Sequence, residues 1–282
     1  MVQTDSRDKL DVRWNRHLIF TQQKVPAFIL GCQRSGTTIC QNVFAGSRKV
    51  AVFREGSREA MTEDWMLRPY DEIQALIDRQ KAKVILFKPI NDSQSALEIL
   101  DQFDNSRVVW IYRHFHDTAN SAVVHWGASQ RDMVVWIGEN LAKHGSLEEA
   151  MPAILRKPSY AVYAEKMSPE SAALLTEWTR APVSEHTGAA IMWYLRNQLF
   201  FEQSLNTNPR SLIVRYEKFV QQPDEQLRRI CRFLSIRHSK KRSRSVVSSS
   251  IGRYEAPDIP PEILEACSGL LDRLNQAEEA GQ

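Results

Sequence analysis

Hydrophobic positions along this chain follow two patterns, short apolar runs and longer stretches with helical spacing. The short runs are rich in β-branched and aromatic residues, which is typical of buried strands. We expect strands over 27–31, 50–53, 83–88, 107–113 and 211–216. The longer stretches predict helices over 36–45, 93–103, 116–126, 186–205, 223–235 and 260–276. Strands that alternate with helices in this way predict an α/β fold, with a P-loop-like parallel sheet flanked by helices.

Residues 127–185 interrupt this alternation. They carry helical patterns such as M-V-V-W-I-G-E-N-L but no convincing strand. An insertion of this kind on an α/β frame covers the carboxyl ends of the strands, where such folds bind ligands. The pattern therefore predicts one domain over 1–282, with 127–185 as a helical cap that contacts the substrate.

Composition narrows the class of protein. The chain has 282 residues, of which 43% are hydrophobic, and it can bury a large core. Its formal net charge of +3 is too small to indicate nucleic acid as a partner. No apolar run is long enough to cross a membrane, and the charged N-terminal stretch lacks the apolar core of a signal peptide. We therefore expect a cytoplasmic protein without a membrane span, in an oligomeric state that the pattern leaves open.

The four cysteines are scattered and lack the C-x-x-C pairing of a metal or redox site, so we expect buried thiols. They are Cys32, Cys40, Cys231 and Cys267. His114 and His116 form an H-x-H pair, but no third ligand lies at a useful spacing. We expect no metal site.

The loop after the first predicted strand carries the strongest chemical signal. Gly31 and Gly36 have the spacing of a phosphate-binding loop, but Thr37 stands where such a loop carries its lysine. A strand-to-helix loop points backbone N–H groups and a helix dipole at one anion. The missing lysine normally reaches the β- and γ-phosphates of a nucleoside triphosphate. We therefore expect a phosphate ligand other than ATP or GTP, with the cation supplied from inside the loop by Arg34.

The string P-A-F-I-L-G-C-Q-R-S-G-T-T resembles the 5′-phosphosulfate loop of sulfotransferases that use 3′-phosphoadenylyl sulfate (PAPS). Its arginine form is most similar to the tyrosylprotein, carbohydrate and bacterial branches of that family, so a bacterial enzyme is expected. The resemblance implies that PAPS binds as a co-substrate, with its 5′-phosphosulfate held by the loop. The implied contacts are Arg34, Ser35, Gly36, Thr37 and Thr38.

Two later strand ends extend this resemblance. Lys88 ends the third predicted strand, and similar sulfotransferases carry a lysine there that faces the transferring sulfuryl group. Arg113 ends the fourth strand, and Ser121 follows it as in the family motif that grips the ribose 3′-phosphate. Asp117 lies between them, and we expect it to cap the start of the next helix. Each strand end is ordinary by itself, but the two motifs in this order make PAPS binding the favoured interpretation.

The C-terminal third contributes further implied contacts. The segment L-I-V-R-Y-E-K-F-V resembles one that places Tyr216 near the adenine, while Glu217 is expected to anchor the structure. The basic stretch 237–250 resembles a loop that folds over the 3′-phosphate, and it ends here in S-I-G-R-Y. It implies contacts from Gly252, Arg253 and one serine. The candidate serines are Ser239, Ser245 and Ser248, with Ser248 included among the expected contacts. The resemblance covers 26–125 and 186–256 and leaves the cap unmatched.

Transfer to a hydroxyl needs a group that removes its proton. Soluble phenol and steroid sulfotransferases use a histidine two residues after the lysine, but this chain has Ile90 there. Glu55 is the better candidate, because its distance from Arg34 resembles that of the catalytic glutamate in tyrosylprotein sulfotransferases. A structural Glu55, paired with Arg54 or Arg58, is the alternative. The base would then be a histidine of the cap region such as His144 or His186.

The resulting hypothesis is sulfuryl transfer from PAPS to a hydroxyl of a small-molecule, glycan or lipid-linked acceptor, without a metal. Glu55 would be the base, and Arg34 and Lys88 would stabilise the developing charge. Two alternatives remain open at this point. One is a nucleotide-dependent kinase with a degenerate phosphate loop, and the other is a non-catalytic relative that binds 3′-phosphoadenosine 5′-phosphate (PAP) or a partner. Acceptor identity and the choice between O- and N-sulfation are open as well.

Overall fold

A computed structural model describes residues 23–246 and 251–281 of the chain. Its centre is a five-stranded sheet with the order β2-β3-β1-β4-β5, in which all neighbouring strands run parallel. The strands are β1 (Val25–Gly31), β2 (Val50–Phe53), β3 (Val84–Phe87), β4 (Arg107–Tyr112) and β5 (Ser211–Arg215). The α/β prediction is confirmed, and the carboxyl ends of all five strands meet at one edge of the sheet.

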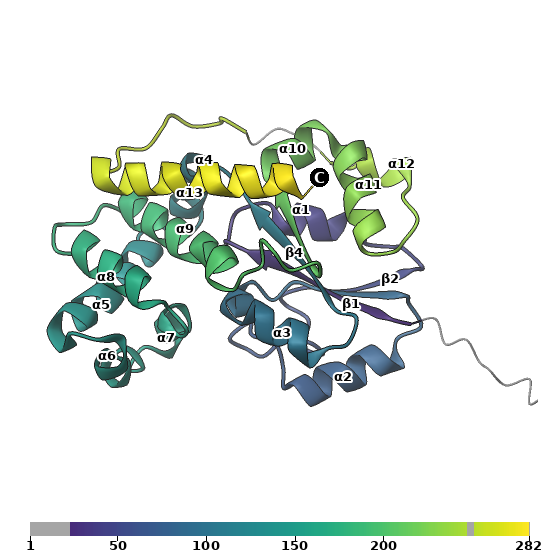
Figure 1. The fold of residues 1–282 in the computed structure, drawn as a ribbon, viewed down its shortest axis with the longest axis horizontal. Coiled ribbons are helices and arrows are strands. Elements are labelled where there is room, and N and C mark those ends of the chain that lie inside the picture. Colours follow the sequence, from purple (N-terminus) through teal and green to yellow (C-terminus); the bar gives the residue numbers. More distant parts are fainter. Residues whose placement is uncertain (1–22, 247–250, 282) are drawn as a thin grey trace, which may run out of the picture.

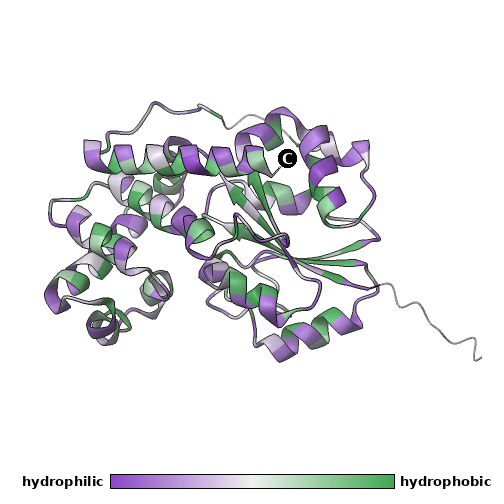
Figure 2. Ribbon diagram, viewed as in Figure 1, coloured by the Kyte–Doolittle hydropathy of each residue, from purple (hydrophilic) through white to green (hydrophobic). Residues whose placement is uncertain are grey.

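Alternate residues of each strand enter two separate cores, one on each face of the sheet. On β1, Phe28 and Leu30 belong to one apolar cluster, whereas Ile29 belongs to the other. Burial on both faces explains why these strands read as continuous apolar runs instead of alternating ones. Figure 2 shows the hydrophobic strands enclosed between helices whose polar residues face outward.

Helices cover both faces of the sheet (Figure 1). In chain order, the helices outside the cap are α1 (Thr37–Asn42), α2 (Tyr70–Arg79), η1 (Ile90–Ser95), α3 (Ala96–Gln102), α4 (Phe115–Trp126), α9 (Glu185–Glu202), α10 (Tyr216–Gln221), α11 (Pro223–Phe233), α12 (Lys240–Ser243) and α13 (Pro261–Ala280). None of the helices in the described part of the chain is long and apolar enough to cross a membrane. All four cysteines are buried and free, as expected.

The segment 127–185 is helical, and its described residues contain no strand. It forms α5 (Ser129–His144), α6 (Leu147–Ile154), α7 (Pro158–Ala164) and α8 (Pro169–Trp178), which gather to one side of the sheet in Figure 1. Helix α9 packs against α4, α5 and α13. Val134 and Leu175 of this segment lie in the same apolar cluster as Trp110 of β4. The cap and the sheet therefore share one core.

Three local expectations were wrong. Helix α2 was missed, although Ile73, Leu76 and Ile77 give it a buried face at helical spacing. Tyr216 was expected as the last residue of a strand, but it begins α10. Asp117 does not cap the following helix, because that helix starts at Phe115 and places Asp117 inside its first turn.

Candidate active site

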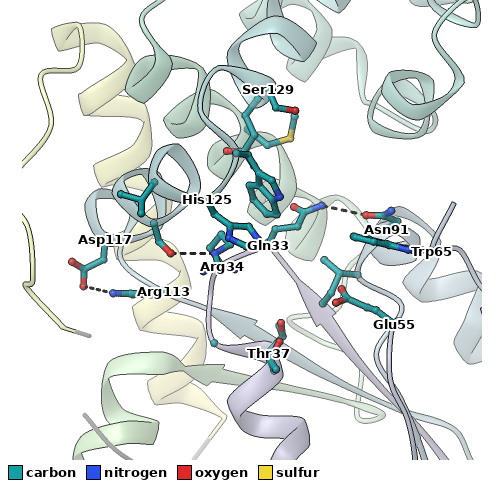
Figure 3. Close-up of a pocket in the computed structure, with 18 of the residues that line it drawn as sticks. Gln33, Arg34, Thr37, Glu55, Trp65, Asn91, Arg113, Asp117, His125 and Ser129 are labelled. Carbon is teal, nitrogen blue, oxygen red and sulfur yellow. Dashed lines mark hydrogen bonds and ion pairs between the residues drawn. The ribbon is translucent and has the colours of Figure 1, made fainter. Parts of the chain in front are cut away.

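A cavity of about 760 Å³ opens at the carboxyl edge of the sheet. Its walls come from the loop after β1, the segments that follow β2, β3 and β4, the cap, and residues 253–254 (Figure 3). Of the residues expected at a site, it brings together Arg34, Gly36, Thr37, Thr38, Glu55, Lys88, Arg113, Ser121, Tyr216 and Arg253. Residues up to 219 positions apart in the sequence, Arg34 and Arg253, therefore meet at one place, as the parallel sheet requires.

The loop after β1 turns sharply into α1 through two residues in the left-handed region. Arg34 has φ of 66° and Gly36 has φ of 91°. A Cβ atom on Gly36 would lie 2.1 Å from the Tyr216 ring, so only glycine fits both the turn and this contact. Ser35 is fully buried, and its hydroxyl has no hydrogen-bond partner among the described residues. Gly36, Thr37 and Thr38 face the cavity.

Glu55 and Lys88 form the central ion pair of the cavity. Glu55 Oε2 lies 2.6 Å from Lys88 Nζ, and the same ammonium donates to Thr38 Oγ1 at 3.1 Å. The Lys88 side chain is only 4% exposed, whereas that of Glu55 is 33% exposed. A buried ammonium needs a carboxylate and hydrogen-bond acceptors to offset the loss of water. Glu55 therefore pairs with the predicted catalytic lysine, and not with Arg54 or Arg58 as the structural alternative required.

Arg34 reaches in the other direction, toward α4. Its Nε donates to Ser121 Oγ at 3.1 Å, and its guanidinium carbon lies 5.6 Å from the centre of the Trp126 ring. Burial, followed by the positive charge of Arg113, lowers the pKa of Arg34 from its ordinary value. The loop arginine and the serine expected at the 3′-phosphate thus occupy one neighbourhood.

Arg113 is buried where β4 ends, and several groups fix its position. Its Nη2 lies 3.1 Å from Asp117 Oδ2, and its guanidinium carbon lies 4.9 Å from the centre of the Tyr216 ring. The indole N–H of Trp193, on α9, donates to the backbone carbonyl of Arg113 at 2.8 Å. Arg113 precedes α4 and Asp117 lies in the first turn of that helix, so the carboxylate reaches back to the guanidinium. The R-x-x-x-D spacing is the signal that the capping expectation overlooked.

The segment around Gly252 docks on α4. The backbone N–H of Gly252 donates to Asp117 Oδ2 at 3.2 Å, and Asn120 Nδ2 donates to the carbonyl of Glu255 at 3.0 Å. These contacts bring Arg253 into the wall of the cavity, although Gly252 itself does not line it. Ser248 lies outside the described residues. Ser239 and Ser245 do not line the cavity, and the Ser245 hydroxyl donates to the carbonyl of Arg242.

Glu217 holds the backbone in place where α4 begins. Its Oε1 accepts from the backbone N–H of His114 at 2.9 Å, and its Oε2 lies 3.2 Å from Nε of Arg215. His114 Nδ1 in turn accepts from the backbone N–H of His116. The H-x-H pair is therefore engaged in local structure, and the described residues contain no group of three or more potential metal ligands.

The sequence did not reveal a second polar cluster at the cavity wall. Gln33 Nε2 donates to Tyr163 Oη at 2.7 Å and to Asn91 Oδ1 at 3.3 Å, and Tyr163 Oη donates to Asn91 Oδ1 at 3.2 Å. Trp65 stands beside this cluster and lines the cavity with 55% of its surface exposed. Neither His144 nor His186 lines the cavity, whereas His125 does.

Comparison with known proteins decides the family. The family model of the sulfotransferase domain matches residues 24–252. The chain belongs to the sulfotransferase family. The bounds of the match enclose 127–185, and the prediction that this segment is a cap insertion stays a prediction. No curated protein matches the sequence of this sulfotransferase at a significant level.

One solved structure with a TM-score above 0.5 shows a similar fold at low sequence identity, and two others are similar to a lesser degree. The sulfotransferase domain from the curacin biosynthetic pathway is similar with a TM-score of 0.51 and 15% identity, over 90% of this chain and 99% of that domain. The sulfotransferase from Alicyclobacillus acidocaldarius gives a TM-score of 0.45 and 16% identity, over 90% of this chain and 94% of that one. Mouse sulfotransferase SULT7A1 complexed with PAP gives 0.44 and 13%, over 92% of this chain and 87% of that one.

Proposed function

We propose that this sulfotransferase transfers the sulfuryl group of PAPS to an acceptor hydroxyl, with Glu55 as the general base. The proposal is carried by one observation, the chain of contacts from Glu55 through Lys88 to Thr38 at 2.6 and 3.1 Å. This chain places a partly exposed carboxylate next to a buried cation and to the phosphate-binding loop. A base, a cation and an anion-binding loop in one cavity are the groups that such a transfer needs.

The cavity suits an anionic nucleotide. Its wall carries the cations Arg34, Lys88, Arg113 and Arg253 against the carboxylates Glu55 and Asp117. Its volume of about 760 Å³ lies in the range that holds a ligand of nucleotide size. Gly36 has no side chain to cover the backbone at the start of α1, where free N–H groups can bind an anion. We assign the loop to the 5′-phosphosulfate, and Arg113, Ser121 and Arg253 to the 3′-phosphate.

The proposed reaction balances without a further reactant. The acceptor hydroxyl gives its proton to Glu55 while its oxygen forms a bond to sulfur. The bond between sulfur and the bridging oxygen of the 5′-phosphate breaks, and PAP leaves with the bonding electrons. Lys88 and Arg34 stabilise the negative charge that grows on that bridging oxygen. The ion pair with Lys88 also keeps Glu55 oriented before the acceptor arrives.

Labelled PAPS offered with glycan, lipid-linked and phenolic acceptors tests the activity, and Glu55→Gln tests the base. Gln keeps the shape of the side chain but cannot accept the proton, so we expect the transfer rate to fall by roughly 10²- to 10⁴-fold. PAP affinity, measured by calorimetry, should hardly change. Glu59→Gln is the matched control, because Glu59 lies four residues on, is 64% exposed and pairs only loosely with Arg79 at 3.7 Å. A fully active Glu55→Gln enzyme would remove Glu55 from the mechanism.

A further inference from the structure

Charged side chains divide the cavity into two ends. Arg113 and Asp117 lie together at one end, and Glu55, Trp65 and Asn91 lie at the other (Figure 3). At the second end the described lining residues carry only two charges, those of Glu55 and Lys88, which neutralise each other at 2.6 Å. This end therefore offers no uncompensated cation for a carboxylate or sulfate on the acceptor, and it favours a neutral molecule.

Trp65 is held in an unfavourable backbone conformation at this neutral end. Its φ of 61° lies in the left-handed region, which costs a bulky residue on the order of 1–2 kcal/mol. Its backbone N–H donates to the carbonyl of Thr62 at 3.1 Å, and the N–H of Thr62 donates to the carbonyl of Met66 at 2.8 Å. A tight turn thus presents the indole to the cavity, where 55% of its surface stays exposed. An exposed aromatic ring in a strained turn beside the proposed base is suited to stack on a ligand.

Two residues that follow β3, Asn91 and Asp92, hydrogen-bond to the backbone of the turn that carries Trp65. Asn91 Nδ2 donates to the carbonyl of Asp64 at 3.2 Å, and Asp92 Oδ2 accepts from the N–H of Leu67 at 2.9 Å. Asn91 also belongs to the cluster with Gln33 and Tyr163, so one residue links the Trp65 turn, the phosphate loop and the cap. Burial raises the pKa of Tyr163, which keeps its hydroxyl protonated as a donor. The Trp65 turn and the polar cluster of Gln33, Asn91 and Tyr163 are therefore joined by hydrogen bonds into one structure.

The neutral polar groups at this wall are amides and hydroxyls. Gln33, Asn91 and Tyr163 are joined to one another by hydrogen bonds, and Asn91 also contacts the Trp65 turn. Amides and hydroxyls both donate and accept hydrogen bonds, which matches a ligand that carries several hydroxyl groups. A flat phenol would use the Trp65 ring but would offer this polar wall only one hydroxyl group.

From this juxtaposition we propose that the acceptor is a neutral sugar, which stacks its apolar C–H face on Trp65 and presents one hydroxyl to Glu55. The inference rests on the proposed function for the sulfuryl transfer itself, but the binding of the sugar does not. In the transfer, the sugar hydroxyl gives its proton to Glu55, the sugar oxygen bonds to sulfur, and PAP departs with the bridging oxygen.

The test measures binding and transfer separately on the full chain. Saturation-transfer NMR with methyl β-D-glucopyranoside, methyl β-D-galactopyranoside and methyl α-D-mannopyranoside detects binding, with and without PAP. The counter-probes are methyl β-D-glucuronide, which adds a charge, 4-nitrophenol, which is flat, and an acidic tyrosine peptide. We expect at least one neutral pyranoside to bind and to accept labelled sulfate with a kcat/KM about tenfold or more above every counter-probe. A preference for any counter-probe, or no binding of the three pyranosides, would overturn the proposal.

Trp65 variants test the platform. Trp65→Ala should weaken pyranoside binding about tenfold, because a stacked ring contributes both its buried area and its geometry. Trp65→Phe should retain most of the binding. Trp65→Gly relieves the left-handed strain, so it should lose binding without a lower melting temperature, which separates recognition from folding. Leu155→Ala is the control, since Leu155 is also an exposed apolar residue, at 49%, but does not line the cavity, and pyranoside affinity should stay within about twofold. Unchanged affinity in Trp65→Ala would remove the platform.

The two proposals fail in different ways. If pyranosides bind in a Trp65-dependent manner but no sulfuryl transfer occurs, the sugar site stands and the proposed transfer fails. If a phenol or peptide is sulfated and the pyranosides are not, the transfer stands and the sugar site fails.

Discussion

The two ends of the cavity differ in their charge. At the end around Arg113, cations and the docked Gly252 segment surround Asp117, which accepts from Gly252 at 3.2 Å and pairs with Arg113 at 3.1 Å. At the end around Glu55, the two charges that the described lining residues carry cancel, and amides, hydroxyls and Trp65 make up the wall. Charge at one end selects a charged ligand, whereas neutrality at the other selects by shape and hydrogen bonding. If the two proposed substrates bind at these two ends, charge recognises one and shape and hydrogen bonding recognise the other, and mutations should separate the two effects.

Lys88 stands at the boundary between the two ends, so its removal should produce the largest effect on both. Lys88→Ala takes the cation from the proposed transition state, and we expect the transfer rate to fall roughly 10²- to 10³-fold. PAP affinity should weaken as well, because Lys88 also contacts Thr38 of the loop. Single-turnover kinetics and calorimetry measure the two losses. Lys88→Met controls for the space left behind, and a loss of rate with unchanged PAP affinity would place Lys88 at the acceptor end alone.

Arg113→Ala should affect only the charged end. Removing a charge-assisted contact costs about 1.5–3 kcal/mol, so PAP affinity should fall by about 10- to 100-fold. In the wild type, PAP should raise the melting temperature without magnesium by binding to the folded state, and ATP, which lacks the 3′-phosphate, should raise it much less. Thermal-shift titrations with both nucleotides measure this difference.

Equal stabilisation by ATP and PAP would contradict the 3′-phosphate assignment. Pyranoside binding should be the same in Arg113→Ala and in the wild type. A parallel loss of sugar binding would show that the two ends are coupled.

Asp92 should make the free energy of unfolding depend on pH, and this effect should be smaller than those of Lys88→Ala and Arg113→Ala. Burial raises the pKa of this carboxyl to about 6, so the folded protein holds the proton more tightly than the unfolded chain does. The stability contributed by Asp92 is therefore greatest below the unfolded pKa and decreases as pH rises toward 6. Asp92→Asn does not titrate, and it should gain on the order of 2 kcal/mol relative to the wild type between pH 4 and pH 7. Urea denaturation at several pH values measures the gap, and a constant gap would contradict the assignment.

Much of the fold could be predicted because its signals are local. The strands are buried on both faces, so each one reads as an apolar run, and Lys88 and Arg113 could be placed because they directly follow such runs. Helix α2 had a visible signal, its apolar positions at 73, 76 and 77, which was not used. The expectation for Asp117 failed because α4 begins two residues earlier, at Phe115, so that Asp117 lies inside its first turn and pairs with Arg113.

The neutral end could not be predicted, because its members are brought together only by tertiary structure. Gln33 and Tyr163 are 130 positions apart in the sequence and yet lie 2.7 Å apart, from amide nitrogen to phenol oxygen. Trp65 is a single exposed aromatic residue in the sequence. Its orientation toward the cavity depends on a positive φ, which no local sequence pattern predicts. The ion pair of Glu55 with Lys88 was likewise not foreseen, because only Arg54 and Arg58 are near Glu55 in the sequence, whereas Lys88 is close only in the folded chain.

The core shared by the cap and the sheet has a consequence for how this protein could be re-engineered. Helix α9 packs on α4, α5 and α13, and its Trp193 fixes the backbone of Arg113 at 2.8 Å. Grafting a cap from another sulfotransferase would therefore disturb the end of the cavity around Arg113 as well, because α9 packs against both the cap and the elements that hold Arg113. The turn that carries Trp65 lies between β2 and α2, where the flanking Met61 and Leu67 are buried in the same core but the Trp65 side chain is exposed. The Trp65 side chain can therefore be exchanged without repacking the core.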